Sequence, residues 1–138
     1  MRISTWRLLF LLASSLLANP ALADDEPDCQ NAMAQQDMNY CANKDFEKAD
    51  GELNEVWKQA KKVAEESDTE QSEDLKGAAK ALLDSQRGWL AYRDGKCVLE
   101  GFAARGGSME PTLVSGCLAQ LTEARTKELK TFINGGEQ

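Results

Sequence analysis

The fold is decided by residues 38–64, which read MNYCANKDFEKADGELNEVWKQAKKVA. Apolar residues recur in this stretch at steps of three and four, the spacing of one face of an α-helix. They are Met38, Cys41, Ala42, Phe46, Ala49, Leu53, Val56, Trp57, Ala60, Val63 and Ala64. The lysines and acidic residues between them are typical of a solvated face. The pattern therefore predicts a long amphipathic helix that buries one stripe.

A second helix is predicted after this one. Ser67 and Glu70 have the spacing of a capping box, which favours a helix start there. The inner stripe that follows consists of Leu75, Ala78, Ala79, Leu82, Gln86, Trp89, Leu90, Arg93 and Cys97. A glycine-rich connection is expected at residues 101–107, because glycine favours turns.

A third helix is predicted from Ser108, a candidate N-cap, with Pro111 in its first turn. Its stripe consists of Val114, Cys117, Leu118, Leu121, Arg125, Leu129 and Phe132, and residues 134–136 read Asn-Gly-Gly, a stop signal. Residues 24–138 show no strand pattern. The fold class predicted is all-α, a small disulfide-stapled bundle of three main helices in one domain.

Two finer expectations concern packing inside these helices. Gly51 and Gly88 fall in helix interiors, where glycine costs roughly 0.5–1 kcal/mol relative to alanine, so we expect close packing at both. We expect most aromatic side chains beyond residue 23 to lie in the core. They are Tyr40, Phe46, Trp57, Trp89, Tyr92, Phe102 and Phe132.

Residues 1–23 have the pattern of a cleavable export signal. Arg2 and Arg7 precede an apolar run at residues 8–17, and Ala21-Leu22-Ala23 offers a small-x-small cleavage site. The run is shorter than the ~20 apolar residues that span a bilayer, so a retained anchor is the weaker alternative. We predict cleavage before Asp24 and a periplasmic or secreted product, free of the membrane.

The chain after residue 23 is acidic. Its 115 residues carry 14 Lys and Arg against 23 Asp and Glu, a net charge of −9. This balance disfavours nucleic acid and anionic membranes as partners, and favours a cationic protein. A negative surface that only maintains solubility is an equally open interpretation.

Four cysteines lie in the part predicted to be exported, where an oxidising compartment allows disulfides. Four cysteines permit three connectivities. We prefer Cys29–Cys41 with Cys97–Cys117, because each pair closes a short segment with chain breaks. Zinc is disfavoured, since the chain has no histidine and no CxxC pair. No metal or cofactor is predicted.

Polar side chains interrupt the inner stripes of two helices. Arg93 and Arg125 fall on inward faces, and a buried guanidinium without a partner is costly. Asp50 and Asp94 flank these stripes, so we predict an inner network of Asp50, Arg93 and Arg125, with Gln86 as a neighbour. Its simplest role is to fix how the helices pack.

Enzymatic activity is not predicted. Without histidine, a Ser-His or Cys-His nucleophile cannot be built, and paired cysteines cannot act as thiolates. Carboxylate pairs such as Glu47 with Asp50 are expected by chance on an acidic helix.

Several motifs together resemble the LprI N-terminal domain family, which is named for a mycobacterial lysozyme-inhibitor lipoprotein. They are Cys29, Met38-Asn39-Tyr40-Cys41-Ala42, residues 49–54 (ADGELN), residues 86–97 (QRGWLAYRDGKC), Gly106-Gly107-Ser108, Cys117 and residues 121–126 (LTEART). The resemblance covers essentially the whole chain after residue 23. It implies an exported, helical, disulfide-bonded domain that inhibits lysozyme. Unlike the namesake, this chain has no cysteine at the predicted cleavage site.

The resemblance leads to a hypothesis about mechanism. Lysozymes of the chicken type are basic and have a cleft with two catalytic carboxylates. An acidic domain is steered toward such a protein, and the segment Arg105, Gly106, Gly107 and Ser108 can offer donors to those carboxylates. We predict a binding module that occludes the cleft without chemistry. The alternative is an envelope interaction protein with another partner.

Overall fold

The computed structural model describes residues 26–135 and contains three α-helices. These are α1 (Gln35–Glu70), α2 (Ala78–Gly101) and α3 (Glu110–Ile133), and a 3-10 turn, η1 (Phe102–Ala104), follows α2. The described residues contain no strand, so the predicted all-α bundle is confirmed. The predicted export signal lies outside the described residues.

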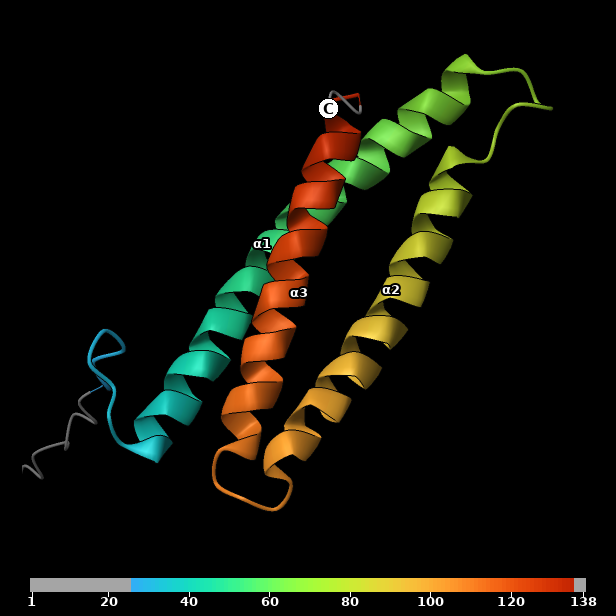
Figure 1. Ribbon diagram of the computed structural model, residues 1–138. Helices are drawn as coiled ribbons and strands as arrows, with labels where there is room; N and C mark the ends of the chain where they lie inside the picture. Colours follow the sequence, from blue (N-terminus) through green and yellow to red (C-terminus); the bar gives the residue numbers. More distant parts are fainter. Residues whose placement is uncertain (1–25, 136–138) are drawn as a thin grey trace, which may run out of the picture.

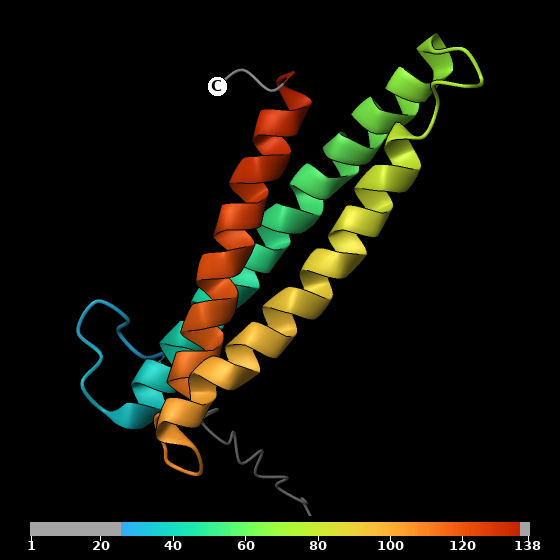
Figure 2. The same cartoon turned by 45° about the vertical axis from the view of Figure 1, so that its right-hand side comes forward.

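The helices run up, down and up, so that neighbours in sequence are antiparallel (Figures 1 and 2). At 1.5 Å per residue, α1 is about 54 Å long and α2 and α3 are about 36 Å long. α3 packs most extensively on α1, while α2 makes fewer contacts with both. Both views show α2 with helices along one side only.

The core follows the stripe predicted for the first helix. Leu53, Val56, Ala60 and Ala64 of α1 are buried against Leu82 of α2 and Leu129 of α3. Trp57, Trp89 and Ile133 pack around this cluster. Several buried positions are alanines, which allow two helix backbones to approach closely.

Both disulfides have the preferred connectivity. Cys29 bonds Cys41 and ties residues 26–34 to α1, whereas Cys97 bonds Cys117 and links α2 to α3. None of the cysteines is free. Cys97 is fully buried, so the second bridge lies inside the bundle.

The predicted start of the second helix is wrong. α1 continues through Ser67 to Glu70, and Leu75 is exposed in the connection. The cap comes from Asp68, whose carboxylate accepts hydrogen bonds from the backbone N–H groups of Gly77 (2.8 Å), Ala78 (2.8 Å) and Ala79 (3.1 Å). These are orphan donors at the start of α2. Gly77 permits the approach with a φ of +139°, a conformation that favours glycine.

Removing this cap gives a prediction. We expect Asp68→Ala to lower the Tm by about 5 °C, because three N–H groups lose their acceptor. Hydrogen bonds, first from Gly77 and then from Ala79 and Ala78, hold the pKa of Asp68 below its ordinary value of 3.8. A carboxylate whose pKa is lower in the folded state than in the unfolded state stabilises the fold at pH values above the unfolded pKa. This contribution is lost as the pH falls through the folded pKa.

Thermal unfolding of both proteins as a function of pH tests this. The Tm difference should be largest near neutral pH and shrink below about pH 3.8. Asp45→Ala, which removes an exposed carboxylate of α1, is the control. A difference that stays constant down to the acid limit contradicts the proposed cap.

The turn into α3 also differs from the prediction at its N-cap. α3 begins at Glu110, and the N-cap position is Met109 and not Ser108. Pro111 lies in the first turn and α3 ends at Ile133, before Asn134 and Gly135, as predicted. Gly101 closes α2 where a Cβ would lie 2.6 Å from Val114 Cγ2, so only glycine fits there without movement.

The two finer packing expectations need correction. A Cβ at Gly51 or Gly88 would meet nothing within 4 Å, so neither glycine marks close packing within the domain. Trp57 and Trp89 pack on the core, but Tyr92 is 59% exposed and Phe102 is 54% exposed. Tyr92 was not part of the inner stripe predicted for this helix, and the structure buries that stripe at Gln86, Arg93 and Cys97, so Tyr92 lies on the outer side.

Candidate functional site

The predicted inhibitory segment, residues 105–108, forms the exposed turn between η1 and α3 at one end of the bundle (Figure 1). Gly106 adopts a φ of +76°. The N–H of Gly107 donates to the carbonyl of Ala104 at 2.8 Å, which closes the turn. The segment is therefore a defined turn that projects into solvent.

Glu110 organises this turn from the first residue of α3. Its carboxylate accepts a hydrogen bond from the Gly106 N–H (2.7 Å) and an ion-paired one from Arg105 Nη1 (2.5 Å). The Gly106 bond, with a smaller contribution from Arg105, lowers the pKa of Glu110. The Arg105 guanidinium also lies 4.7 Å from the ring centre of Phe102. Arg105 is thus exposed but held in one place.

Ser108 connects the turn to the beginning of α1. Its carbonyl accepts a hydrogen bond from Asn39 Nδ2 at 3.0 Å. Thr112 of α3 donates to Asn39 Oδ1, and Gln35 Nε2 donates to Thr112 Oγ1 at 2.9 Å. These contacts position the turn relative to two helices.

Arg93 lies between all three helices. Its Nε donates to Asp94 Oδ1 at 2.9 Å, and its Nη1 lies 3.3 Å from both Asp50 Oδ1 of α1 and Thr122 Oγ1 of α3. The guanidinium is 5.3 Å from the ring centre of Phe46. Only 9% of the Arg93 side chain is exposed, so these contacts replace water.

Arg125 makes a second polar group nearby. Its Nε donates to Gln86 Oε1 (3.0 Å), its Nη2 to Ser85 Oγ (2.9 Å) and its Nη1 to Glu128 Oε2 (2.8 Å). The contacts with Gln86 and Ser85 join α3 to α2, whereas Glu128 lies on α3 itself, and the Arg125 side chain is 11% exposed.

The structure thus divides the predicted network into two groups. The Trp89 ring lies 5.1 Å from the Arg93 guanidinium and 5.9 Å from that of Arg125. The two arginines share this indole and no carboxylate. Sequence reasoning missed Thr122, Ser85 and Glu128. Of these, only Glu128 could have been predicted from the sequence, because its i, i+3 spacing from Arg125 favours an ion pair on one helix.

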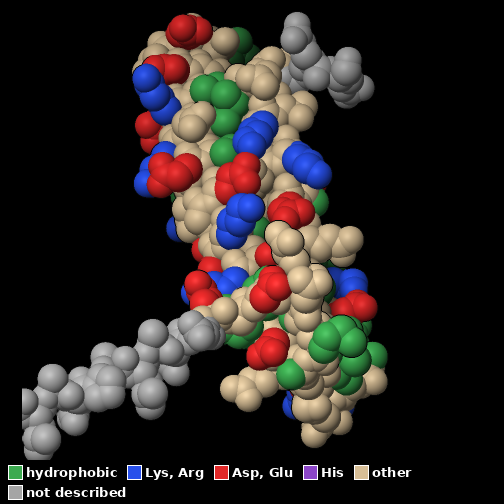
Figure 3. Space-filling model, turned by 90° about the vertical axis from the view of Figure 1, so that its left-hand side faces the viewer, with side chains coloured by type: hydrophobic (Ala, Val, Ile, Leu, Met, Phe, Trp, Pro, Cys, Tyr) green, Lys and Arg blue, Asp and Glu red, His purple; other side chains and the backbone are tan. Residues whose placement is uncertain are grey.

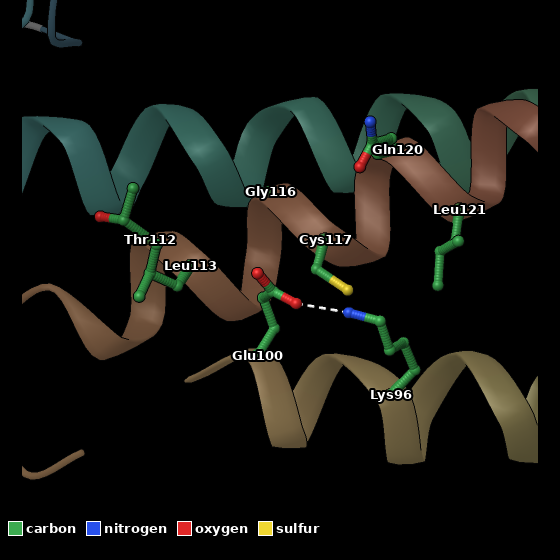
Figure 4. Close-up of a pocket in the computed structure, with 8 residues that line it drawn as sticks. All are labelled: Lys96, Glu100, Thr112, Leu113, Gly116, Cys117, Gln120 and Leu121. Carbon is green, nitrogen blue, oxygen red and sulfur yellow. Dashed lines mark hydrogen bonds and ion pairs between the residues drawn. The ribbon is translucent and has the colours of Figure 1, made fainter. Parts of the chain in front are cut away.

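A groove of about 450 Å³ lies between α2 and α3 near their disulfide (Figure 4). Lys96 and Glu100 form an ion pair at the groove. The bond from Glu100 raises the pKa of Lys96, so this amine stays protonated and is a poor base or nucleophile. The groove therefore offers a charge pair and not a reactive group.

Within residues 26–135, no cluster of three or more potential ligands is arranged to hold a metal ion. No helix of the described part is both long and apolar enough to cross a membrane. Figure 3 shows one face of the molecule, on which acidic and basic side chains alternate along the helices and hydrophobic ones gather near the lower end.

Two of the comparisons with known proteins found a match. The family model described as lysozyme inhibitor LprI matches residues 27–129, nearly the whole described structure. The chain belongs to the lysozyme inhibitor LprI family. It is also 45% identical over 140 residues to an uncharacterised protein of Rhizobium meliloti (strain 1021), with 99% of each chain covered. No solved structure matches it.

Membership of the LprI family confirms the resemblance seen in the sequence. The family is one of inhibitors and not of enzymes. The matched region contains both buried arginine groups, the turn at residues 105–108 and all four cysteines.

Proposed function

We propose that this protein is a periplasmic or secreted inhibitor of lysozyme that binds the enzyme and blocks its cleft without chemistry. The observation that carries the proposal is the match of the LprI family model to residues 27–129, which include nearly all of the three helices. The disulfides support an oxidising compartment.

The charge distribution supports a basic partner. Residues 26–135 carry 20 Asp and Glu against 14 Lys and Arg, a net charge of −6. The excess lies on α1, which has ten acidic and five basic residues. Such a surface attracts a basic enzyme from a distance and accelerates encounter.

The turn at residues 105–108 is the proposed contact with the cleft. The Arg105 guanidinium has five N–H donors, of which the ion pair with Glu110 uses one. Because Glu110 and Phe102 hold the side chain, little rotamer entropy remains to be lost on binding. The remaining donors can then bind a cleft carboxylate.

The test titrates the oxidised protein into chicken-type lysozyme during lysis of cell walls, with binding measured in parallel at two salt concentrations. We expect saturable, stoichiometric inhibition that weakens with salt but survives at physiological ionic strength. No saturable inhibition would instead favour an envelope interaction protein with another partner.

Arg105→Ala should weaken inhibition at least tenfold, a loss of about 1.4 kcal/mol, because a charged donor to a buried carboxylate is removed. Ser108→Ala should have a smaller effect in the same direction. Arg87→Ala is the matched control, since it removes an exposed arginine and changes the net charge equally. Equal inhibition by the Arg105 and Arg87 variants would exclude the turn as the contact.

A further inference from the structure

The outer face of α2 is defined here by Gly88, Tyr92, Gly95 and Leu99. Their spacing of four, three and four places them along one line of the helix. All four are exposed, Tyr92 by 59% and Leu99 by 67%. Ala91 and Val98 extend the line on one side, and both are exposed.

This face lies opposite the side of α2 that packs in the bundle. The buried residues of the same stretch are Gln86, Arg93 and Cys97, which lie roughly half a turn around the helix. Figures 1 and 2 show no other helix beyond α2 on that side. The outer face is therefore apolar, exposed and unpartnered within the described domain.

The two glycines have no role in packing within the domain. A Cβ at Gly88 or Gly95 would meet nothing within 4 Å. Glycine inside a helix is unfavourable relative to alanine. Along the outer face, glycines that lack a side chain alternate with the large side chains of Tyr92 and Leu99. This alternation allows the large side chains of another helix to pack against the glycines.

We infer that the outer face binds the same face of a second copy of this chain, with the two α2 helices antiparallel. In a heptad pattern, Tyr92 and Leu99 occupy one core position and Gly88 and Gly95 the other. A twofold axis midway between residues 93 and 94 places Tyr92 opposite the partner copy's Gly95, and Leu99 opposite its Gly88. A parallel pair would instead set Tyr92 against Tyr92 and glycine against glycine.

Charge favours a second copy over a basic partner at this face. The four residues of the outer face are uncharged, and α2 carries four basic and three acidic residues, whereas α1 carries five and ten. Two acidic copies therefore meet here with the least repulsion. A basic protein is attracted to α1 instead. The proposal is independent of lysozyme inhibition.

The expected dimer is weak. A helix about 36 Å long and 10–12 Å wide offers a footprint of about 400 Å². Stable complexes bury about 800 Å² of each partner, so this contact falls in the transient class. Its concentration dependence is then measurable at protein concentrations of the order of 100 µM.

Sedimentation velocity of the oxidised protein tests the proposal. We expect the mass to approach that of a dimer as concentration rises, and more so at about 500 mM than at about 50 mM salt, because screening reduces repulsion between like-charged copies. Lysozyme binding should respond to salt in the opposite direction. A monomer at all concentrations and both salts overturns the inference.

Leu99→Asp should weaken the dimer at least tenfold, because it places a charge opposite the partner copy. Leu75→Asp is the matched control, since Leu75 in the α1–α2 connection is equally exposed, at 66%, and the charge change is identical. If Leu99→Asp leaves the dimer intact, the outer face is not the dimer contact and the inference fails. If it abolishes lysozyme binding in a protein that stays monomeric, the face serves that enzyme and the inference fails.

An exchange of opposed residues tests the antiparallel register. Gly88→Leu should weaken the dimer because two leucines would then face each other. Leu99→Gly should weaken it because two glycines would face each other and leave a space. The double variant restores one leucine opposite one glycine, so it should dimerise more strongly than either single variant. Gly88→Leu should also raise the Tm of the monomer, since leucine is a better helix former. Additive losses in the double variant overturn this register.

Discussion

Arg93→Ala is expected to destabilise the bundle by about 3 kcal/mol, in the range for losing a buried side chain that joins a hydrogen-bonded network. The substitution removes a buried side chain that contacts α1 through Asp50, α3 through Thr122 and the rings of Phe46 and Trp89. Thr122 is fully buried and loses a polar partner. Asp50 and Asp94 are partly exposed and can be hydrated again, so they account for the smaller share.

Urea unfolding of the Arg93 variants measures this effect. Arg93→Met retains much of the packed stem, so it should lose less stability than Arg93→Ala. Arg87→Ala, which removes an exposed arginine of the same helix, should change stability by less than about 0.5 kcal/mol. If the Arg93 and Arg87 variants are equally stable, Arg93 does not hold the three helices together.

The second large effect is expected on removing the disulfide between α2 and α3. The double variant Cys97→Ala with Cys117→Ala should lose about 3 kcal/mol, since the bridge spans 20 residues and limits the unfolded chain. α2 also has the fewest helix contacts, so the bridge carries much of its attachment. We therefore expect weaker dimerisation through the outer face as well.

The double variant Cys29→Ala with Cys41→Ala is the comparison for that measurement. Its bridge spans 12 residues, close to the other in length, but it ties down only the segment before α1. When it is removed, this segment gains freedom in the folded state too, so the net loss of stability should be below about 1 kcal/mol. Equal losses for the two double variants would show that only loop length matters.

Periodicity was sufficient for the three helices because it reports which side of each helix is buried. Leu53, Val56 and Ala60 recur at helical spacing, and all three are in the core. The end of α3 could also be predicted, because the stop signal consists of the adjacent residues Asn134 and Gly135.

The start of α2 was not readable in this way. Ser67 and Glu70 form a good local capping pattern, yet both lie within α1. Asp68 caps α2 across nine to eleven residues of sequence, because the connection folds back on itself. A contact over that separation leaves no fixed spacing to recognise.

The same distinction applies to the candidate sites. Arg93 and Arg125 were recognisable as buried cations, but the division into two groups around Trp89 depends on how α2 and α3 are rotated. Tyr92 was expected in the core as an aromatic residue, but it lies outside the predicted inner stripe and is exposed. The contact of Glu110 with Arg105 depends on the conformation of the turn and could not be predicted from the sequence.

The sequence by itself determined the three helices, the all-α class and the family, because apolar spacing and the positions of cysteines are properties of the chain. The tertiary structure alone decided the cap on α2, the partners of the two buried arginines and that no other helix of the described domain covers the outer face of α2. Each of these depends on the rotation and separation of whole helices. The rotation and separation of helices result from the packing of many side chains at once, so no short stretch of sequence predicts them.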